Sequence, residues 1–219
     1  ASRFFTHSFF FNRNQARWGL EITRKTRRQK VFLNYGFETR NDEQVESKIR
    51  IRLRPNLQWQ LSGISGEQSL TTTGQPFQNR NYRIRTNTLE PSLVITRGTN
   101  FRCTFRYVID QKKNRLDSAL TLNAYRIVAD IRVNGKKNNA ITVKVSNNTI
   151  QWNAAPGSEN SAVGFVMLEG LRPGKNWTWQ MEWTKVIGKN LECTMQYEGR
   201  SSQINAPIHL GRASVRALF

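Results

Sequence analysis

The sequence predicts an all-β protein of antiparallel strands, and three observations support that prediction. Apolar and polar residues alternate with a period of two in about fourteen segments, as expected of strands with one apolar face. Mostly short turns rich in Gly, Pro, Asn and Asp separate these segments. No segment has the apolar period of an amphipathic helix. The predicted fold is therefore an antiparallel sheet without helices.

The individual strands follow from the alternation and from the turn signals between them. The clearest case is Ile49, Ile51 and Leu53, which alternate with four basic residues. Asn134-Gly135 is a strong signal for a tight hairpin, whereas the polar stretch from Gly63 to Gln78 predicts a loop. In chain order, the expected strands are 3–12, 15–25, 31–37, 48–54, 57–62, 82–95, 101–109, 120–124, 127–133, 141–146, 163–167, 177–184, 192–198 and 208–219. Pro91 indicates a strand start or a bulge within 82–95.

The composition indicates a single sheet with one apolar face. Only 37% of the 219 residues are hydrophobic, yet aromatic residues reach 11% and include six Trp. A strand with lipid on one side and water or polar groups on the other needs only every second residue to be apolar. No run of 18 or more apolar residues occurs, which excludes a helical membrane protein.

The last expected strand has an apolar face and a cationic face. Gly211, Ala213, Val215, Ala217 and Phe219 fall on one side, and Arg212, Ser214 and Arg216 fall on the other. This strand resembles the closing strand of bacterial outer-membrane β-barrels, whose C-terminal Phe helps the assembly machinery to recognise them. The resemblance implies an assembly signal in Val215, Ala217 and Phe219. The alternative is the final strand of a soluble sheet.

Aromatic residues on the apolar faces favour lipid contact. Trp177, Trp179, Met181 and Trp183 form one row, and Trp and Tyr are enriched where a barrel meets the membrane interface. A Trp-rich sandwich core or a carbohydrate-stacking face remains the alternative. The predicted lipid-facing aromatic residues are Trp18, Tyr35, Trp59, Phe105, Tyr107, Trp177, Trp179, Trp183 and Tyr197.

Basic residues lie opposite the apolar rows. The chain has 34 Lys and Arg against 15 Asp and Glu, a formal charge of +19, which implies an anionic partner. On the lipid side near the midplane a cation would cost about 2 to 4 kcal/mol, so in a barrel this face is the lumen. The predicted lumen-facing residues are Arg50, Arg52, Arg54, Arg83, Arg85, Arg102, Arg106, Arg132, Lys144, Arg212 and Arg216.

The second half of the chain resembles a known group of proteins. VGFVMLEGLRPGKNWTWQMEWTK, LECTMQYEGR and IHLGRASVRALF are similar to the C-terminal ends of large outer-membrane proteins of the Bacteroidota. The resemblance implies one outer-membrane β-barrel domain over residues 1–219, forming the C-terminal part of a longer chain in an envelope complex. It also implies structural, translocation, secretion or assembly roles. The expected partners are outer-membrane lipids, lipopolysaccharide, other envelope proteins or an acidic plug, whereas nucleic acid is not expected.

No catalytic, metal or cofactor motif is evident. His7 and His209 are the two histidines, and a hydrolase that pairs them with Ser8 or Ser214 is the weakest interpretation. Cys103 and Cys193 lack the spacing of a metal or redox site. The sequence therefore predicts a non-enzymatic, porin-like barrel. The second function class is a soluble, secreted β-sandwich that binds an anionic glycan or nucleic acid through arginine rows.

Overall fold

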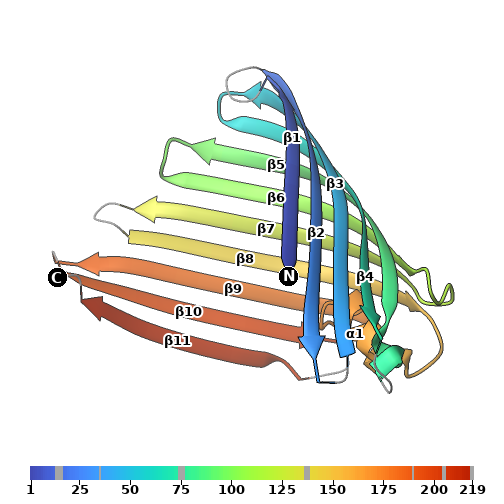
Figure 1. The fold of residues 1–219 in the computed structure, drawn as a ribbon. Coiled ribbons are helices and arrows are strands. Elements are labelled where there is room, and N and C mark those ends of the chain that lie inside the picture. The colour runs from blue at the N-terminus through green and yellow to red at the C-terminus, as the bar shows by residue number, and fades with distance from the viewer. Residues whose placement is uncertain are drawn as a thin grey trace.

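In the computed structural model of the protein, the described residues form eleven antiparallel strands in one continuous sheet (Figure 1). The structure describes residues 1–12, 17–34, 36–73, 77–135, 139–188, 190–203 and 206–217. The strands are β1 (Ser2–Phe11), β2 (Trp18–Leu33), β3 (Gly36–Arg54), β4 (Leu57–Thr72), β5 (Tyr82–Arg97), β6 (Phe101–Asn114), β7 (Thr121–Gly135), β8 (Asn139–Asn153), β9 (Gly174–Ile187), β10 (Leu191–Ser202) and β11 (Ile208–Ala217).

The strands follow one another across the sheet in chain order. Each pairs with the strand before it and the strand after it, so β1 and β11 are the two edges. The sheet curves strongly, bringing β1 and β2 in front of the later strands in Figure 1. Among the described residues β1 and β11 do not pair with each other. The expected antiparallel all-β architecture is present, but the sheet is open.

The predicted count of about fourteen strands is wrong, because apolar residues change faces within single strands. In β7, Leu122 and Ala124 lie on one face, whereas Ile127 and Ile131 lie on the other. The sequence pattern therefore shows a break where the backbone continues. β5 continues past Pro91, where the sequence predicts a strand start or a bulge, and β4 continues through most of the loop expected at 63–78.

Pro91 lies inside β5 and does not end it. Its row is paired with Leu61 of β4, but the register to β6 passes from Leu89 directly to Ser92. A proline has no N–H to donate to a sheet ladder, which accounts for an interruption on one side of the strand. The continuous pairing with β4 on the other side keeps β5 in a strand conformation through Pro91.

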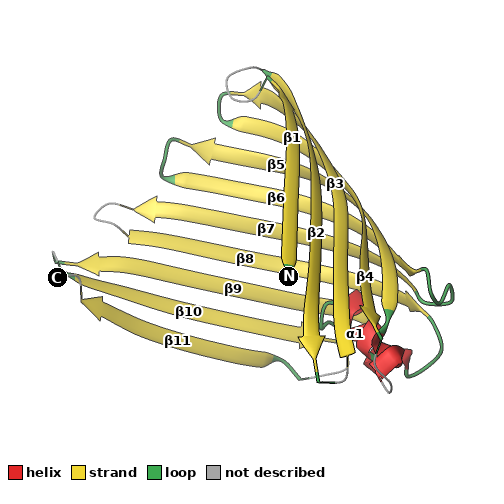
Figure 2. Cartoon of the chain, viewed as in Figure 1, coloured by secondary structure: helices red, strands yellow, loops and turns green. Residues whose placement is uncertain are grey.

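The expectation of no helices is also wrong. The described residues include α1 (Ala162–Leu168) and the 3₁₀ turns η1 (Phe77–Arg80) and η2 (Ser158–Asn160), all at one end of the sheet (Figure 2). The expected strand at 163–167 is α1, whose N-terminus is capped by Ser161 accepting from the Gly164 N–H at 3.0 Å. Val163 and Met167, four residues apart, then share the buried side of the helix.

The buried core lies between α1 and the sheet, so it occupies one end of one face. Met167 is 1% exposed and packs with residues from four different strands. Because one short helix contacts so many strands, it sits on the concave side of the curved sheet. The cluster consists of Leu70, Tyr82, Ile84, Leu120, Leu122, Ala124, Ile150, Val163, Met167 and Leu168.

Candidate functional site: the two faces of the sheet

The sheet has two chemically different faces, which the position of α1 distinguishes. We call the face that carries α1 the inner face and the opposite one the outer face. Tyr82, Ile84 and Leu122 pack against α1, so every residue in register with them, at alternate positions along each strand, is on the inner face. The register across all eleven strands assigns the remaining residues.

Apolar residues form a continuous belt on the outer face, from β1 to β11. Many of its large side chains are exposed, among them Phe105 at 47% and Ile127 at 59%. Four basic residues share these rows, and each lies at an end of the belt on its own strand: Arg24, Arg97, Lys175 and Lys185. This outer belt comprises Phe9, Phe11, Trp18, Leu20, Ile22, Val45, Ile49, Ile51, Leu57, Trp59, Leu61, Leu89, Pro91, Leu93, Ile95, Phe101, Cys103, Phe105, Tyr107, Ile109, Tyr125, Ile127, Ala129, Ile131, Val133, Ile141, Val143, Val145, Trp177, Trp179, Met181, Trp183, Leu191, Cys193, Met195, Tyr197, Ala213, Val215 and Ala217.

The predicted aromatic residues that the structure describes all lie in the outer belt. The indole N–H of Trp183 donates to Asn139 Oδ1 at 2.7 Å beside the β7–β8 connection, so its polar edge points toward the rim. Trp152 is the exception among the tryptophans: it lies on the inner face and donates to Ser158 Oγ. Of the predicted assembly signal, Val215 and Ala217 are on the outer face of β11. Tyr35 and Phe219 fall outside the described residues.

Trp179 fills the space left by a glycine on the neighbouring strand. A Cβ on Gly199 would come within 2.1 Å of the Trp179 ring, so the indole lies directly over Gly199. Beyond it, the Trp179 and His209 ring centroids are 5.5 Å apart, and Tyr197 Oη is 2.7 Å from His209 Nδ1. The imidazole is thus part of an aromatic cluster on the outer face. His7 is on β1, at the opposite edge of the sheet, so the strands of the two histidines are not neighbours.

Eight of the predicted lumen-facing residues share the inner face: Arg50, Arg52, Arg102, Arg106, Arg132, Lys144, Arg212 and Arg216. Three do not. Arg83 and Arg85 are on the outer face, beyond the end of the outer belt, because their neighbours Tyr82 and Ile84 turn inward to α1. Arg54 follows a register shift after Arg52 and lies opposite Leu57 at the β3–β4 hairpin.

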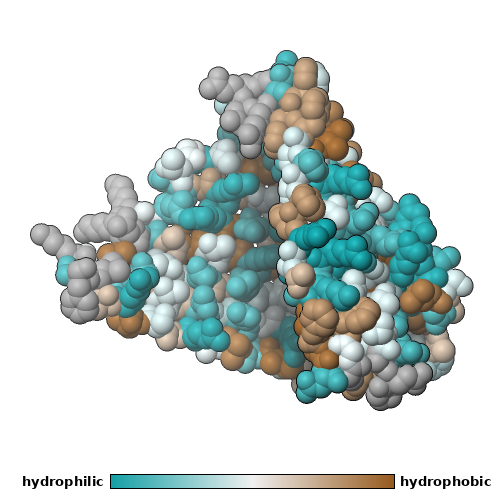
Figure 3. Space-filling view, in the orientation of Figure 1, coloured by the Kyte–Doolittle hydropathy of each residue, from teal (hydrophilic) through white to brown (hydrophobic). Residues whose placement is uncertain are grey.

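The inner face is polar and of mixed charge, and not uniformly cationic. Lys25 pairs with Glu46 at 3.2 Å, and Arg106 approaches Glu90 at 4.0 Å. Hydroxyl and amide groups fill the rows between charges; for example, Ser146 Oγ lies 2.6 Å from Thr178 Oγ1. The space-filling view shows a hollow between β1 and the strands behind it, bordered mostly by hydrophilic residues (Figure 3).

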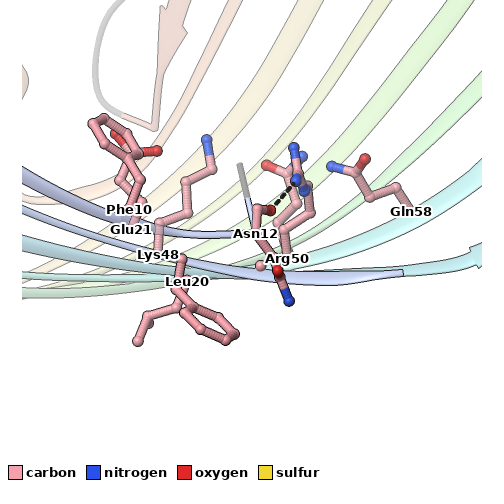
Figure 4. Close-up of a pocket in the computed structure, with 10 residues that line it drawn as sticks. Phe10, Asn12, Leu20, Glu21, Lys48, Arg50 and Gln58 are labelled. Carbon is pink, nitrogen blue, oxygen red and sulfur yellow. Dashed lines mark hydrogen bonds between the residues drawn. The ribbon is translucent and has the colours of Figure 1, made fainter. Parts of the chain in front are cut away.

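A small cavity of about 110 Å³ lies at the β1 end of the inner face. Glu21, Lys48, Arg50 and Gln58 project from one side of the strands and Leu20 from the other (Figure 4). Arg50 Nη2 donates to the Asn12 carbonyl at 3.1 Å. A Cβ at Gly19 would lie 2.6 Å from that same carbonyl, so the close approach of these strands needs a glycine.

The segment that carries α1 is fastened to the inner face by a partly buried charge cluster. Lys112 Nζ donates to Glu169 Oε1 at 2.6 Å and to the Met167 carbonyl at 3.0 Å, and lies 3.5 Å from Asp110 Oδ2. Arg126 contacts the other Glu169 oxygen at 3.5 Å. Burial opposes ionisation of Glu169, but the hydrogen bond and charge of Lys112, aided by Arg126, outweigh it and hold its pKa below the ordinary value.

Sequence reasoning did not find this cluster. Lys112 and Asp110 lie between two expected strands, 101–109 and 120–124, but belong to the end of β6 in the structure. Asp110 and Lys112 are two residues apart, which places both on one face of a strand. This spacing was the signal available in the sequence. A cavity of about 400 Å³ borders the cluster, with Arg106, Lys144 and Asn148 in its wall.

The described residues offer no group of three or more His, Cys, Asp or Glu placed to hold a metal ion. Their helices are all too short or too polar to cross a membrane. Cys103 and Cys193 are free thiols on the outer face.

Comparison with known proteins gives a likeness of fold alone. No protein-family model matches the chain, and no curated protein does. Among solved structures, the chain is similar to BamA from Haemophilus ducreyi lacking POTRA domains 1–3, with a TM-score of 0.50 and 9% sequence identity. The likeness covers 92% of this chain and 49% of that one, so the chain spans about half the length of its structural neighbour.

Proposed function

We propose that this chain forms part of the wall of a transmembrane β-barrel in a bacterial outer membrane, as a structural or translocation component of an envelope complex. The single observation that carries the proposal is the outer belt: apolar side chains face outward on all eleven described strands, while charges face inward or lie at or beyond the belt's ends. A solvated sheet gains nothing from exposing so much apolar surface. In a membrane the same surface is the required one.

The dimensions of the belt support the proposal. From Phe101 to Ile109, β6 advances about 27 Å at roughly 3.4 Å per residue. A strand tilt of about 40° reduces this to about 21 Å across the membrane, close to the ~25 Å apolar band of outer-membrane barrels. The fold likeness to BamA, an outer-membrane β-barrel, agrees with this architecture.

The connections suggest an orientation. Tight hairpins such as those between β3 and β4 and between β5 and β6 lie at one end, and the longer connections from β4 to β5 and from β8 to β9 lie at the other. Outer-membrane barrels have short periplasmic turns and longer outer loops. We therefore assign the end that carries α1 to the outer side, where lipopolysaccharide would meet the basic residues of the strand ends and connections.

The finer assignments rest on the sequence and on the chemistry of the inner face. Placement in a large Bacteroidota protein, as its C-terminal part, rests on the sequence resemblance of the second half of the chain. The polar inner face of mixed charge suits a water-filled interior or an inserted plug, with Lys144 and Arg212 among its basic groups. A non-enzymatic role fits the lack of a recognisable catalytic motif in the sequence. A soluble sandwich that binds an anionic polymer would need two packed sheets, and the described strands form one.

Tryptophan quenching by lipid tests the proposal. Two variants, one keeping only Trp177 and one keeping only Trp152, are reconstituted into vesicles whose acyl chains carry bromine. Trp177 is 50% exposed on the outer face, and Trp152 lies on the inner face. We expect strong quenching of Trp177 and little of Trp152. Equal quenching, or a chain that stays dispersed without detergent and binds anionic polymers with a steep salt dependence, would exclude the membrane assignment.

A further inference from the structure

We propose that the two free edges of the sheet, β1 and β11, are bridged in the membrane by an odd number of additional antiparallel strands, and that a second copy of this chain does not supply them. The inference rests on the proposed function, because only in a membrane must a sheet close. It follows from the direction of the edge strands and from the chemistry of their side chains.

Both edges carry backbone groups that lipid cannot satisfy. Within the described residues, β1 pairs with β2 alone and β11 pairs with β10 alone. In hydrocarbon each unsatisfied N–H or C=O costs several kcal/mol, which is why membrane-spanning sheets are closed. The outer belt reaches both edges through Phe9 and Val215. These edges therefore lie at membrane depth, and some polypeptide must pair with them.

Strand direction determines how many strands can bridge the gap. The eleven strands alternate in direction, so β1 and β11 run the same way. Direct pairing of β11 with β1 would create one parallel contact in an otherwise antiparallel sheet. Inserting one strand, or any odd number, restores alternation at both junctions, whereas an even number does not. The completed antiparallel barrel would thus have an even total, as most bacterial single-chain barrels do.

A second copy cannot provide these strands. A copy in the same orientation would place its β1 beside β11 with both strands parallel. Antiparallel pairing of the edges would require a two-fold axis in the membrane plane, which inverts the second copy. Its α1 would then lie on the opposite side of the membrane from the first. Directed insertion into the membrane gives every copy one orientation, so this arrangement is excluded.

Side chains at the edges define the chemistry of the bridging strands. The inner face is mostly polar in its centre, but at the edges it carries Phe4, Ile208 and Leu210, exposed at 64%, 52% and 54%. A cavity of about 380 Å³ opens beside Ile208 and Leu210. The strands that fit have apolar residues outward, to continue the outer belt, and apolar residues inward next to these three.

Photo-crosslinking in the protein's own membrane tests the proposal. Photo-reactive benzoylphenylalanine replaces Phe9 in β1, Val215 in β11 or, as the control, Ile127 in the central strand β7. The adducts are mapped by mass spectrometry in cells that express light and heavy isotope forms of the chain together. We expect Phe9 and Val215 each to link to polypeptide outside residues 1–219, and Ile127 to link to lipid.

The outcomes separate the possible sources. A crosslinked product with the mass of the uncrosslinked polypeptide places the bridging strands in that same polypeptide. A product with a larger mass places them in another protein. Both results support the proposal. Links between residues 2–11 and 208–217 overturn it, whether within one chain or between light and heavy copies. Edges that link only to lipid, or a density map with an odd number of strands, overturn it too. Failure of Ile127 to reach lipid would instead contradict the proposed function.

Discussion

Gly199 and Trp179 show how tightly the outer face is packed between β9 and β11. The indole occupies the space where a side chain at position 199 would lie, 2.1 Å from the position that a Cβ on Gly199 would take. Aromatic side chains covering a cross-strand glycine are a known device for fixing strand register. The pair therefore holds β10 in its position between its neighbours.

We expect Gly199→Ala to displace the Trp179 ring and to lower the free energy of unfolding by about 1 to 3 kcal/mol, the usual cost of overpacking. Gly211→Ala is the matched control, because nothing lies within 4 Å of a Cβ at that position on β11. Urea unfolding in detergent, followed by tryptophan fluorescence, measures both. Equal midpoints for the two variants would show that Trp179 moves aside without cost.

At the residue scale, alternation identifies two faces but not which one is inside. It correctly separates Arg102 and Arg106 from the aromatic row of β6. It misplaces Arg83 and Arg85, because the apolar residues beside them face α1 and not the outer belt. The sequence does not show tertiary contacts. At the end of the sheet that carries α1, the apolar side of each strand is the inner side, because the helix covers it.

Among the elements, α1 and its connection depend on one carboxylate. Glu169 ends the helix in a left-handed conformation at φ 55° and binds both Lys112 and Arg126. The sequence contained signals for this helix, namely a serine cap at Ser161 and a glycine at Gly170 just after its end. The period-two reading of Val163, Phe165 and Met167 concealed them.

Acid should release this connection. The pKa of Glu169 is lowered in the folded protein, so its ion pairs stabilise the structure above about pH 4.3 and are lost as the pH falls through the lowered pKa. In a variant that keeps only Trp152, whose ring packs against the core cluster, we expect an acid transition in the fluorescence. Glu169→Gln should remove the transition, whereas Glu159→Gln in η2 should retain it. A transition unchanged by Glu169→Gln would assign it to another group.

For the whole molecule, the two faces should respond differently to the same added charge. Ile127→Arg places a cation in the middle of the outer belt, where lipid exposure should cost about 2 to 4 kcal/mol. Gln180→Arg adds the same charge to the exposed inner face of β9 and should cost little. Folding yield into lipid vesicles, read from the shift in gel mobility between unboiled and boiled samples, compares them. Equal yields would argue against lipid on the outer side.

The antiparallel architecture could be predicted from local sequence patterns. Period-two alternation and tight turns give an antiparallel sheet, and the sorting of arginine from tryptophan gives its two faces. Strand number was not predictable in this way, because Leu122 and Ile127 belong to one strand but to opposite faces. Curvature, open edges and the helix on the inner face depend on contacts between distant segments.

The inward position of α1 has a consequence for anything that moves through the interior. The longest connection of the chain, between β8 and β9, does not extend away from the wall but is fastened to it through Lys112 and the core cluster. In the proposed barrel, a solute that followed the inner face toward that end would meet this helix before it left the interior. The tethered segment would therefore narrow the interior of the proposed barrel at this end.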